Sequence, residues 1–388
     1  MQFHEAKKLV ERGLILPAPG AVYVNKDVVL ERLAPGAVLY PGAQVSGSAT
    51  TLAPGSKVGT EGPAQIRNVA LGRGASIASG TAENCCLLDG ASLGPNSHVR
   101  AGTLLEEFAS TGHAVGLKQT ILLSFVTLGS QINFCDCLMA GGTSRNDHSE
   151  VGSGFIHFNF TPFGERGDKA TASLFGDVQR GVFLKDGRIF LGGCGGVVGP
   201  VQVDYGTTLA AGSVYRKDYG PGLLAYGEKT IAKSRSFDPL LVRGVGRRVD
   251  RCLNYVGELR ALYAWYEHVR LAAASDDIDA LVIRSGMERI TEGIKERGKQ
   301  IERFLGGAKP ADDDAQADIV ASQGKWSALK AGFVVSPETA SHESLRLSFL
   351  DANSPGEDHV AWVQSLSAAE IEKGRAWLTA VAQPSSPS

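Results

Sequence analysis

This sequence has few cysteines, a small net charge and no long apolar run. Its 388 residues include only six cysteines, and a formal charge of -2 remains when 39 basic residues are set against 41 acidic ones. Cys85 and Cys86 are adjacent, and no spacing typical of a disulfide framework occurs, which indicates reduced thiols. The near-neutral charge supplies no basic field for nucleic acid or for an anionic membrane, so we expect neither as a partner.

Membrane and export signals are lacking as well. No apolar stretch is as long as a transmembrane helix, and the first residues, Met-Gln-Phe-His-Glu-Ala-Lys-Lys, contain no apolar core of a signal peptide. With the reduced thiols, these absences predict a cytoplasmic protein.

Glycine, by contrast, is abundant, with 48 residues and no collagen triplet. Between residues 197 and 215 an aliphatic residue recurs every six positions, at Val197, Val203 and Leu209, with small residues between. Six residues form one flat strand and one tight corner, so this spacing places the three side chains inside a prism. The sequence therefore predicts a mainly β fold, a coil of hexapeptide repeats whose outer faces are free to bind.

The organisation changes along the chain. The hexapeptide register loosens between residues 120 and 188, where polar stretches marked by Gly and Pro predict inserted loops near 160–190. After Gly222, apolar residues spaced by three and four predict two helices, which either close on each other as a hairpin or form a surface that assembles subunits or covers the end of the prism. The expected segments are an N-terminal helical lead-in (1–20), the β-helix domain (21–222), a helical hairpin (223–308), a linker (309–335) and a C-terminal helical segment with a disordered tail (336–388).

Three stretches carry a resemblance to a known family: His98 to Gln119, the Gly-x-Gly-x-x-x-x-Asn element from Gly152 to Asn159, and Ala-Ala-Gly-Ser from Ala210 to Ser213. The chain resembles, over residues 1–219, the acetyltransferase half of the bifunctional N-acetylglucosamine-1-phosphate uridyltransferase / glucosamine-1-phosphate acetyltransferase. This resemblance implies a left-handed parallel β-helix, a homotrimer, and acetyl-CoA or another acyl-CoA as co-substrate. The nucleotide-binding half would precede the prism, where few residues are present, so uridyl transfer is not expected.

Arg100 and Lys118 are the candidate phosphate ligands. In the family, an arginine and a lysine at this spacing hold the phosphate of the amino-sugar phosphate. Eighteen residues make one full coil, so we expect the two side chains to lie one above the other on one face, where two cations suit a phosphate. The alternative is that both are solvated surface cations.

The position of the family's general base is altered. Counting back from Asn159, its histidine is replaced by Asp136, and an ordinary aspartate titrates too low to accept a proton from an amine efficiently. His148 and His157 are candidate replacements, and His113 is a further one. Each of these histidines could instead be a hydrogen-bonded structural residue.

Further contacts are implied by the resemblance. Asn159 is expected to orient the nucleophile or the donor, and Lys169 to stand for the family's acceptor-binding lysine. The glycine run from Gly192 to Gly196 could admit a pantetheine arm in a groove between prisms, with Ser153, Gly193 and Ala211 as the expected coenzyme contacts.

A metal site is the other chemistry considered. Cys135 and Cys137 are expected on the same side of a strand, because alternate residues share a face, and Cys194 and His157 could complete a ligand set. The spacing matches no recognisable site, and we expect no metal.

The sequence thus predicts a left-handed β-helix followed by a C-terminal α-helical domain. We expect an acyl-CoA-dependent acyltransferase acting on an amino sugar or amino-sugar phosphate, in nucleotide-sugar or cell-envelope metabolism. The alternative is a catalytically silent scaffold or regulatory subunit that binds a sugar nucleotide and uses its helical tail to bind a protein partner.

Overall fold

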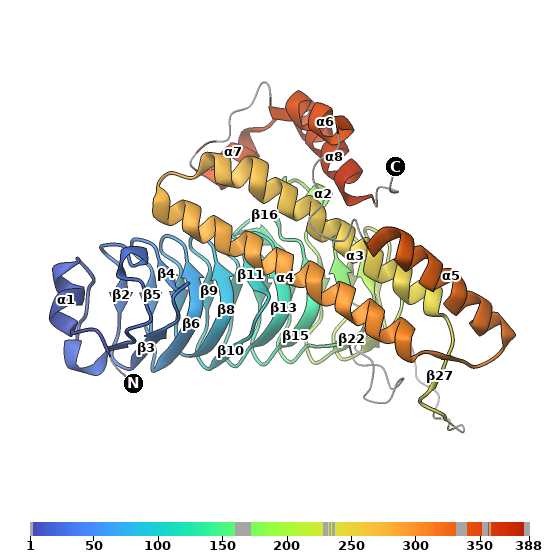
Figure 1. Cartoon of the computed structure of the whole chain (residues 1–388), viewed down its shortest axis with the longest axis horizontal. Coiled ribbons are helices and arrows are strands. Elements are labelled where there is room, and N and C mark those ends of the chain that lie inside the picture. The colour runs from blue at the N-terminus through green and yellow to red at the C-terminus, as the bar shows by residue number, and fades with distance from the viewer. Residues whose placement is uncertain are drawn as a thin grey trace.

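The first part of the chain winds into a prism of parallel strands, and the second part forms helices that lie along it (Figure 1). The computed structural model describes residues 3–159, 172–227, 232, 234, 237–330, 340–350, 356 and 358–383. The predicted class, a parallel β-helix followed by a helical C-terminal region, is confirmed.

The prism has three walls, which we call walls 1, 2 and 3 in the order in which each coil passes through them. Wall 1 is a ten-stranded parallel sheet, and walls 2 and 3 form a second sheet whose longer strands bend at a corner. Wall 1 contains β2 (Val38–Leu39), β5 (Lys57–Val58), β7 (Ser76–Ile77), β9 (Ser92–Leu93), β12 (Ser110–Thr111), β14 (Thr127–Leu128), β18 (Glu150–Val151), β21 (Phe190–Leu191), β24 (Thr208–Leu209) and β26 (Leu224–Ala225). Wall 2 contains β1 (Tyr23–Val24), β3 (Ala43–Ser46), β10 (Ser97–Val99), β19 (Ile156–Phe158), β22 (Gly196–Val198) and β25 (Val214–Tyr215). Wall 3 contains β4 (Thr51–Leu52), β11 (Thr103–Leu105), β20 (Ser173–Phe175) and β23 (Gln202–Val203). The bent strands that run from wall 2 into wall 3 are β6 (Ala64–Leu71), β8 (Gly80–Leu87), β13 (Gly116–Leu122) and β15 (Asn133–Met139).

The hexapeptide period sets which residues fill the interior. Val197, Val203 and Leu209 lie on walls 2, 3 and 1 of one coil, and all three are fully buried. Each hexad therefore supplies one wall and one inward side chain, as the spacing predicts. Stacked coils then bury a continuous aliphatic column, which stabilises the prism through the hydrophobic effect.

The corner between walls 2 and 3 has a repeated backbone conformation. Asn68, Asn84, Gln119 and Asp136 lie at this corner in separate coils, with φ between 47° and 57°, and Gly102 occupies the same place with a φ of 76°. Asn and Asp adopt this left-handed conformation more readily than most residues. Asp136 is therefore part of a structural column of corner residues.

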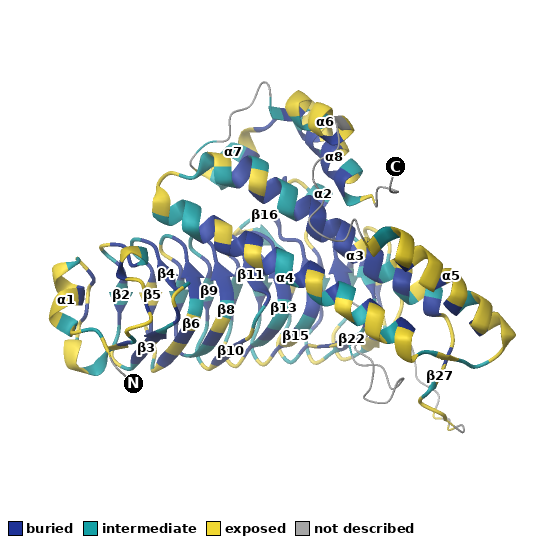
Figure 2. Ribbon diagram, viewed as in Figure 1, coloured by how far each residue is buried: buried dark blue, intermediate teal, exposed yellow. Residues whose placement is uncertain are grey.

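A helical hairpin lies lengthwise along wall 3. It consists of α3 (Val245–Trp265), the π-helix η3 (Tyr266–Arg270), the 3-10 helix η4 (Leu271–Ala273) and α4 (Asp277–Gly307). The apolar positions that predict these helices are buried or partly buried, including Val249, Leu259 and Ile290 (Figure 2). The hairpin thus covers the prism as well as closing on itself.

The outer face of wall 3 is apolar, which explains why helices cover it. Ala70, Cys86, Leu104, Ile121 and Leu138 form one row across successive coils, and each is at most 2% exposed. Helix α4 approaches this row closely at Gly286, where an added Cβ would lie 3.6 Å from Leu104 Cδ1. Burial of such a row favours docking of the hairpin.

Arg270 anchors the end of the hairpin to the prism. Its guanidinium lies 2.6 Å from the Glu107 carboxylate and 3.1 Å from that of Glu106, and all three side chains are nearly inaccessible to solvent. Tyr266 donates a hydrogen bond of 2.9 Å to Glu106, and Ser124 donates one of 3.0 Å to Glu107. The buried charges are therefore paired and hydrogen-bonded, as burial requires.

The remaining elements correct one expected segment. Within the expected linker, residues 313–329 form the helix α5 (Asp313–Leu329), which is capped by Asp312 and buries Ile319 and Trp326. The other elements are α1 (Ala6–Glu11), 3-10 helices at Pro19–Ala21 and Leu30–Arg32, α2 (Val178–Gly181), α6 (Ala340–Leu350), α7 (His359–Ser365), α8 (Ala368–Ala382), the antiparallel hairpin β16 (Gly142–Ser144) and β17 (Asp147–His148), and the parallel pair β27 (Leu241–Val242) and β28 (Lys309–Pro310). Of the helices in the described ranges, none is both long and apolar enough to cross a bilayer.

Candidate functional site

Wall 2 presents two rows of outward side chains, because alternate residues of a strand share a face. Strand register aligns both rows across consecutive coils. The first, which we call the histidine row, contains Gln65, Thr81, His98, Gly116 and Asn133. The second, which we call the cation row, contains Arg67, Glu83, Arg100, Lys118 and Cys135.

Arg100 and Lys118 lie on neighbouring coils of the cation row, as their eighteen-residue spacing predicts. The Arg100 backbone N–H donates to Leu117 O at 2.9 Å, and Lys118 pairs in register with Cys135 of the next coil. Arg100 is exposed and Lys118 is half-buried. Within the described ranges neither side chain forms an ion pair, so both charges are available to an anionic ligand.

Cys135 is the next residue of the cation row, but Cys137, its partner in the expected metal site, lies on a different wall. The Sγ of Cys135 is 3.7 Å from Arg100 Nη2 and 3.6 Å from Asn133 Oδ1. The chain turns at Asp136, so Cys135 lies on wall 2 and the fully buried Cys137 on wall 3. The expectation that the two thiols share a face is therefore wrong. The described residues contain no group of three or more His, Cys, Asp or Glu placed to hold a metal.

Asp136 is enclosed by the helical hairpin. Its Oδ1 pairs with Arg297 of α4, and its Oδ2 accepts a hydrogen bond from the Asn159 amide. The side chains of Asp136 and Arg297 are only 7% and 3% exposed. A carboxylate held by a guanidinium and closed off from solvent is poorly placed to accept a proton from a substrate amine.

The side chain of His157 points into the interior of the prism. It is 3% exposed, its Nδ1 donates to Cys135 O at 2.5 Å, and its Nε2 lies 2.7 Å from Ser173 Oγ. Burial lowers the pKa of this imidazole to about 4, so it is neutral near pH 7. The expectation that His157 acts as the base is corrected: it is a structural histidine of the core.

Of the described residues, the candidate base His148 and the expected acceptor ligand Asn159 do not lie beside the two cations. His148 lies in the β16–β17 hairpin, which leaves the prism between walls 3 and 1, and its Nδ1 donates to Arg145 O at 2.8 Å. Asn159 is engaged by Asp136, as described above. Lys169 lies outside the described residues.

Ser153, Gly193 and Ala211 form a column at the corner between walls 1 and 2. Cys194 N donates to Ser153 O at 2.8 Å, Gly212 N donates to Gly193 O at 2.9 Å, and a Cβ on Gly192 would lie within 2.6 Å of the Ala211 backbone. The column therefore carries only small side chains at this corner.

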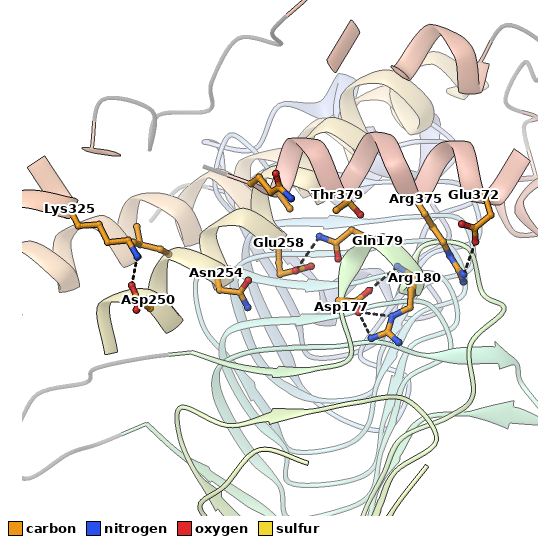
Figure 3. Close-up of a pocket in the computed structure, with 13 residues that line it drawn as sticks. Asp177, Gln179, Arg180, Asp250, Asn254, Glu258, Lys325, Glu372, Arg375 and Thr379 are labelled. Carbon is orange, nitrogen blue, oxygen red and sulfur yellow. Dashed lines mark hydrogen bonds and ion pairs between the residues drawn. The ribbon is translucent and has the colours of Figure 1, made fainter. Parts of the chain in front are cut away.

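A separate hollow of about 580 Å³ lies between α2, α3, α5 and α8 (Figure 3). Glu258 of α3 lines it, accepting hydrogen bonds from Val178 N at 2.8 Å and Gln179 Nε2 at 3.2 Å. Burial raises the pKa of this carboxyl to about 7. No local pattern in the sequence points to Glu258, since its partners on α2 lie 79 and 80 residues earlier in the chain.

His98 is the residue of wall 2 that sequence reasoning missed. It lies two positions before Arg100, so both side chains project from the same face of the strand. Its exposed imidazole has Nδ1 at 3.0 Å from Thr81 Oγ1. The i, i+2 spacing from Arg100 was the available signal.

The fold and this wall define a hexapeptide-type parallel β-helix protein with a cationic outer row. No family model matches the chain. The "Bifunctional protein GlmU" of Shouchella clausii is 24% identical over 226 residues, which are 58% of this chain and 43% of that protein. The protein of the same name from Clavibacter sepedonicus is 27% identical over 212 residues, which are 55% and 38% of the two chains. The chain thus spans about two fifths of the length of these curated relatives.

Among solved structures, a UDP-N-acetylglucosamine acyltransferase from Campylobacter jejuni is 17% identical, with 74% of this chain and 94% of that chain covered and a TM-score of 0.21. The resemblance to the bifunctional protein that the sequence predicts is confirmed by the curated matches.

Proposed function

We propose that this chain transfers an acyl group from acyl-CoA to an amino sugar or amino-sugar phosphate. The proposal rests on the placement of Arg100 and Lys118 at the same register position on adjacent coils of an accessible wall. Two cations on adjacent coils can each donate charge-assisted hydrogen bonds to one phosphate. The similarity to bifunctional GlmU proteins supports the same acceptor class.

The corner column at Ser153, Gly193 and Ala211 supports the donor part of the proposal. It borders the same wall in the three coils that follow the last coil of the two rows, so a thioester bound there would approach the histidine and cation rows along the prism axis. We propose acetyl-CoA as the first donor to test, without a metal.

The assembly is a further part of the proposal. The helical hairpin covers wall 3, which leaves walls 1 and 2 as the faces that a homotrimer would bring together. Grooves between wall 2 of one copy and its neighbour would then enclose the rows. A protein partner for the helical tail and a role in nucleotide-sugar or cell-envelope metabolism stay as predictions.

The test is release of free thiol from acetyl-CoA in the presence of glucosamine 1-phosphate, read against a reaction without acceptor. We expect acceptor-dependent thiol release by the wild-type protein and loss of most of it in Arg100→Gln. The matched control is Arg67→Gln, which removes a cation from the same row two coils away. If no amino-sugar phosphate supports thiol release, the acyltransferase proposal is wrong and the silent scaffold becomes the better account.

A further inference from the structure

An acceptor that carries a phosphate and an amine on adjacent carbons needs its base close to its phosphate ligands. Of the expected bases, Asp136 and His157 are enclosed, and His148 lies on the β16–β17 hairpin between walls 3 and 1. His98 is exposed and lies two residues from Arg100 on the same face, which separates their Cα atoms by roughly 7 Å. On wall 2 it is therefore the imidazole nearest in register to the proposed phosphate ligands.

Thr81 fixes how the His98 ring is presented. Its Oγ1 lies 3.0 Å from His98 Nδ1, one coil away in the histidine row. When Nδ1 carries the proton and donates to this hydroxyl, Nε2 holds a lone pair that can accept a proton. A hydrogen bond on one ring nitrogen thus orients the other toward the wall's surface.

Gly116 leaves open surface beside the His98 ring. It pairs in register with His98, and a Cβ built there would find its nearest neighbour, Asn133 Oδ1, at 3.7 Å. Among the residues that the structure describes, none comes closer to this position, so the wall is open there between His98 and Asn133. Arg100 and Lys118 border this open surface in the cation row. A small sugar ring could lie on it with its phosphate against both cations.

We propose that His98 is the general base of the acyl transfer, with Thr81 as its positioning residue and an amino-sugar 1-phosphate as the acceptor. This inference rests on the proposed function. The acceptor's neutral amine attacks the thioester carbonyl carbon, so a C–N bond forms and the C–S bond breaks. The proton lost by the nitrogen passes to His98 Nε2, and the imidazolium returns it to the leaving thiolate. The products are an amide and free coenzyme A thiol.

The charged side chains that surround His98 by register are Glu83, Arg100 and Lys118, all in the cation row. The base role requires an unprotonated ring nitrogen, because only that form of the imidazole can accept the proton of the amine.

The experiment compares His98→Gln, Thr81→Val, Thr81→Ser and the control Gln65→Ala in acceptor-dependent thiol release. We expect His98→Gln to lower kcat by about 10² to 10⁴-fold with little change in KM for glucosamine 1-phosphate. Thr81→Val should lower kcat by about tenfold, and Thr81→Ser, which keeps the hydroxyl, should restore it. Gln65→Ala, two coils away in the same row, should behave as wild type.

Three outcomes separate this inference from the proposed function. An active wild type with an equally active His98→Gln overturns the base role and leaves acyl transfer standing. An inactive wild type overturns the proposed function and the base role together. In that case, imidazole NMR signals of His98 that do not move on adding glucosamine 1-phosphate also overturn the acceptor position.

Discussion

Arg297 of helix α4 forms a buried ion pair with Asp136, at the corner where walls 2 and 3 of the prism meet. The resemblance places the family's general base at this corner. In this chain the position instead anchors a helix that lies 161 residues further along the sequence. The Asp136 carboxylate therefore stabilises the fold and has no role in the proposed reaction.

Breaking this pair should be strongly destabilising. Arg297→Met leaves the Asp136 carboxylate buried without its partner, and we expect the free energy of unfolding to fall by about 3 to 5 kcal/mol. Adding Asp136→Asn should recover much of the loss, since asparagine already occupies this left-handed corner at Asn68 and Asn84. Denaturant unfolding of the single and double variants measures both effects.

The matched control is an exposed ion pair between helices. Lys325 and Asp250 have side chains 48% and 58% exposed, so Lys325→Met should lower the free energy of unfolding by about 1 kcal/mol or less. Equal losses for Arg297→Met and Lys325→Met would contradict the assignment of the Arg297 pair as buried.

The apolar row on the outside of wall 3 gives a second prediction. Leu104 is fully buried although it points out of the prism, because α4 covers it. We expect Leu104→Ala to lower the free energy of unfolding by about 2 to 5 kcal/mol. Ser92→Ala, at an outward position of the uncovered wall 1, should change it by about 0.5 kcal/mol at most. A small effect at Leu104 would mean that the hairpin does not dock on this wall.

Glu258 should make stability depend on pH. Burial raises its pKa from about 4.5 to about 7, so the folded protein holds this proton more tightly than the unfolded chain does. The stabilising contribution is fully present below pH 4.5 and is lost as pH rises to about 7. Relative to Glu258→Gln, the wild type should therefore lose about 3 kcal/mol across this window.

The variant is needed as a reference because His157 makes stability change with pH in the opposite direction, over an overlapping pH range. Its pKa is lowered by burial to about 4, so its contribution is lost as pH falls below its ordinary value. Unfolding curves of wild type and Glu258→Gln at several pH values isolate the carboxyl. A difference between them that does not vary with pH would show that Glu258 is not buried in this way.

The interior of the prism could be predicted from sequence because the period itself sets the geometry. Val197, Val203 and Leu209 each end on a different wall, and the eighteen-residue spacing places Arg100 beside Lys118. The helices after Gly222 were also predictable, since their apolar spacing is local.

The features that the sequence does not predict depend on contacts between segments far apart in the chain, or on a turn of the backbone within a strand. The partner of Asp136 is on α4, far along the chain, and the corner at that residue separates Cys135 from Cys137. Residues 313–329 look like a polar linker by composition, but a capping Asp312 and the buried Trp326 make them a helix. For His98 the sequence shows only its i, i+2 spacing from Arg100, whereas its contact with Thr81 depends on the register between coils.

The most direct test of the account is calorimetric titration of the protein with glucosamine 1-phosphate, because the central claim is that Arg100 and Lys118 of wall 2 bind an anionic sugar. The account predicts binding that weakens about 10- to 100-fold when Arg100→Gln and Lys118→Gln are combined, and that is unchanged in Arg67→Gln. Equal affinity in the wild type and the double variant would contradict it.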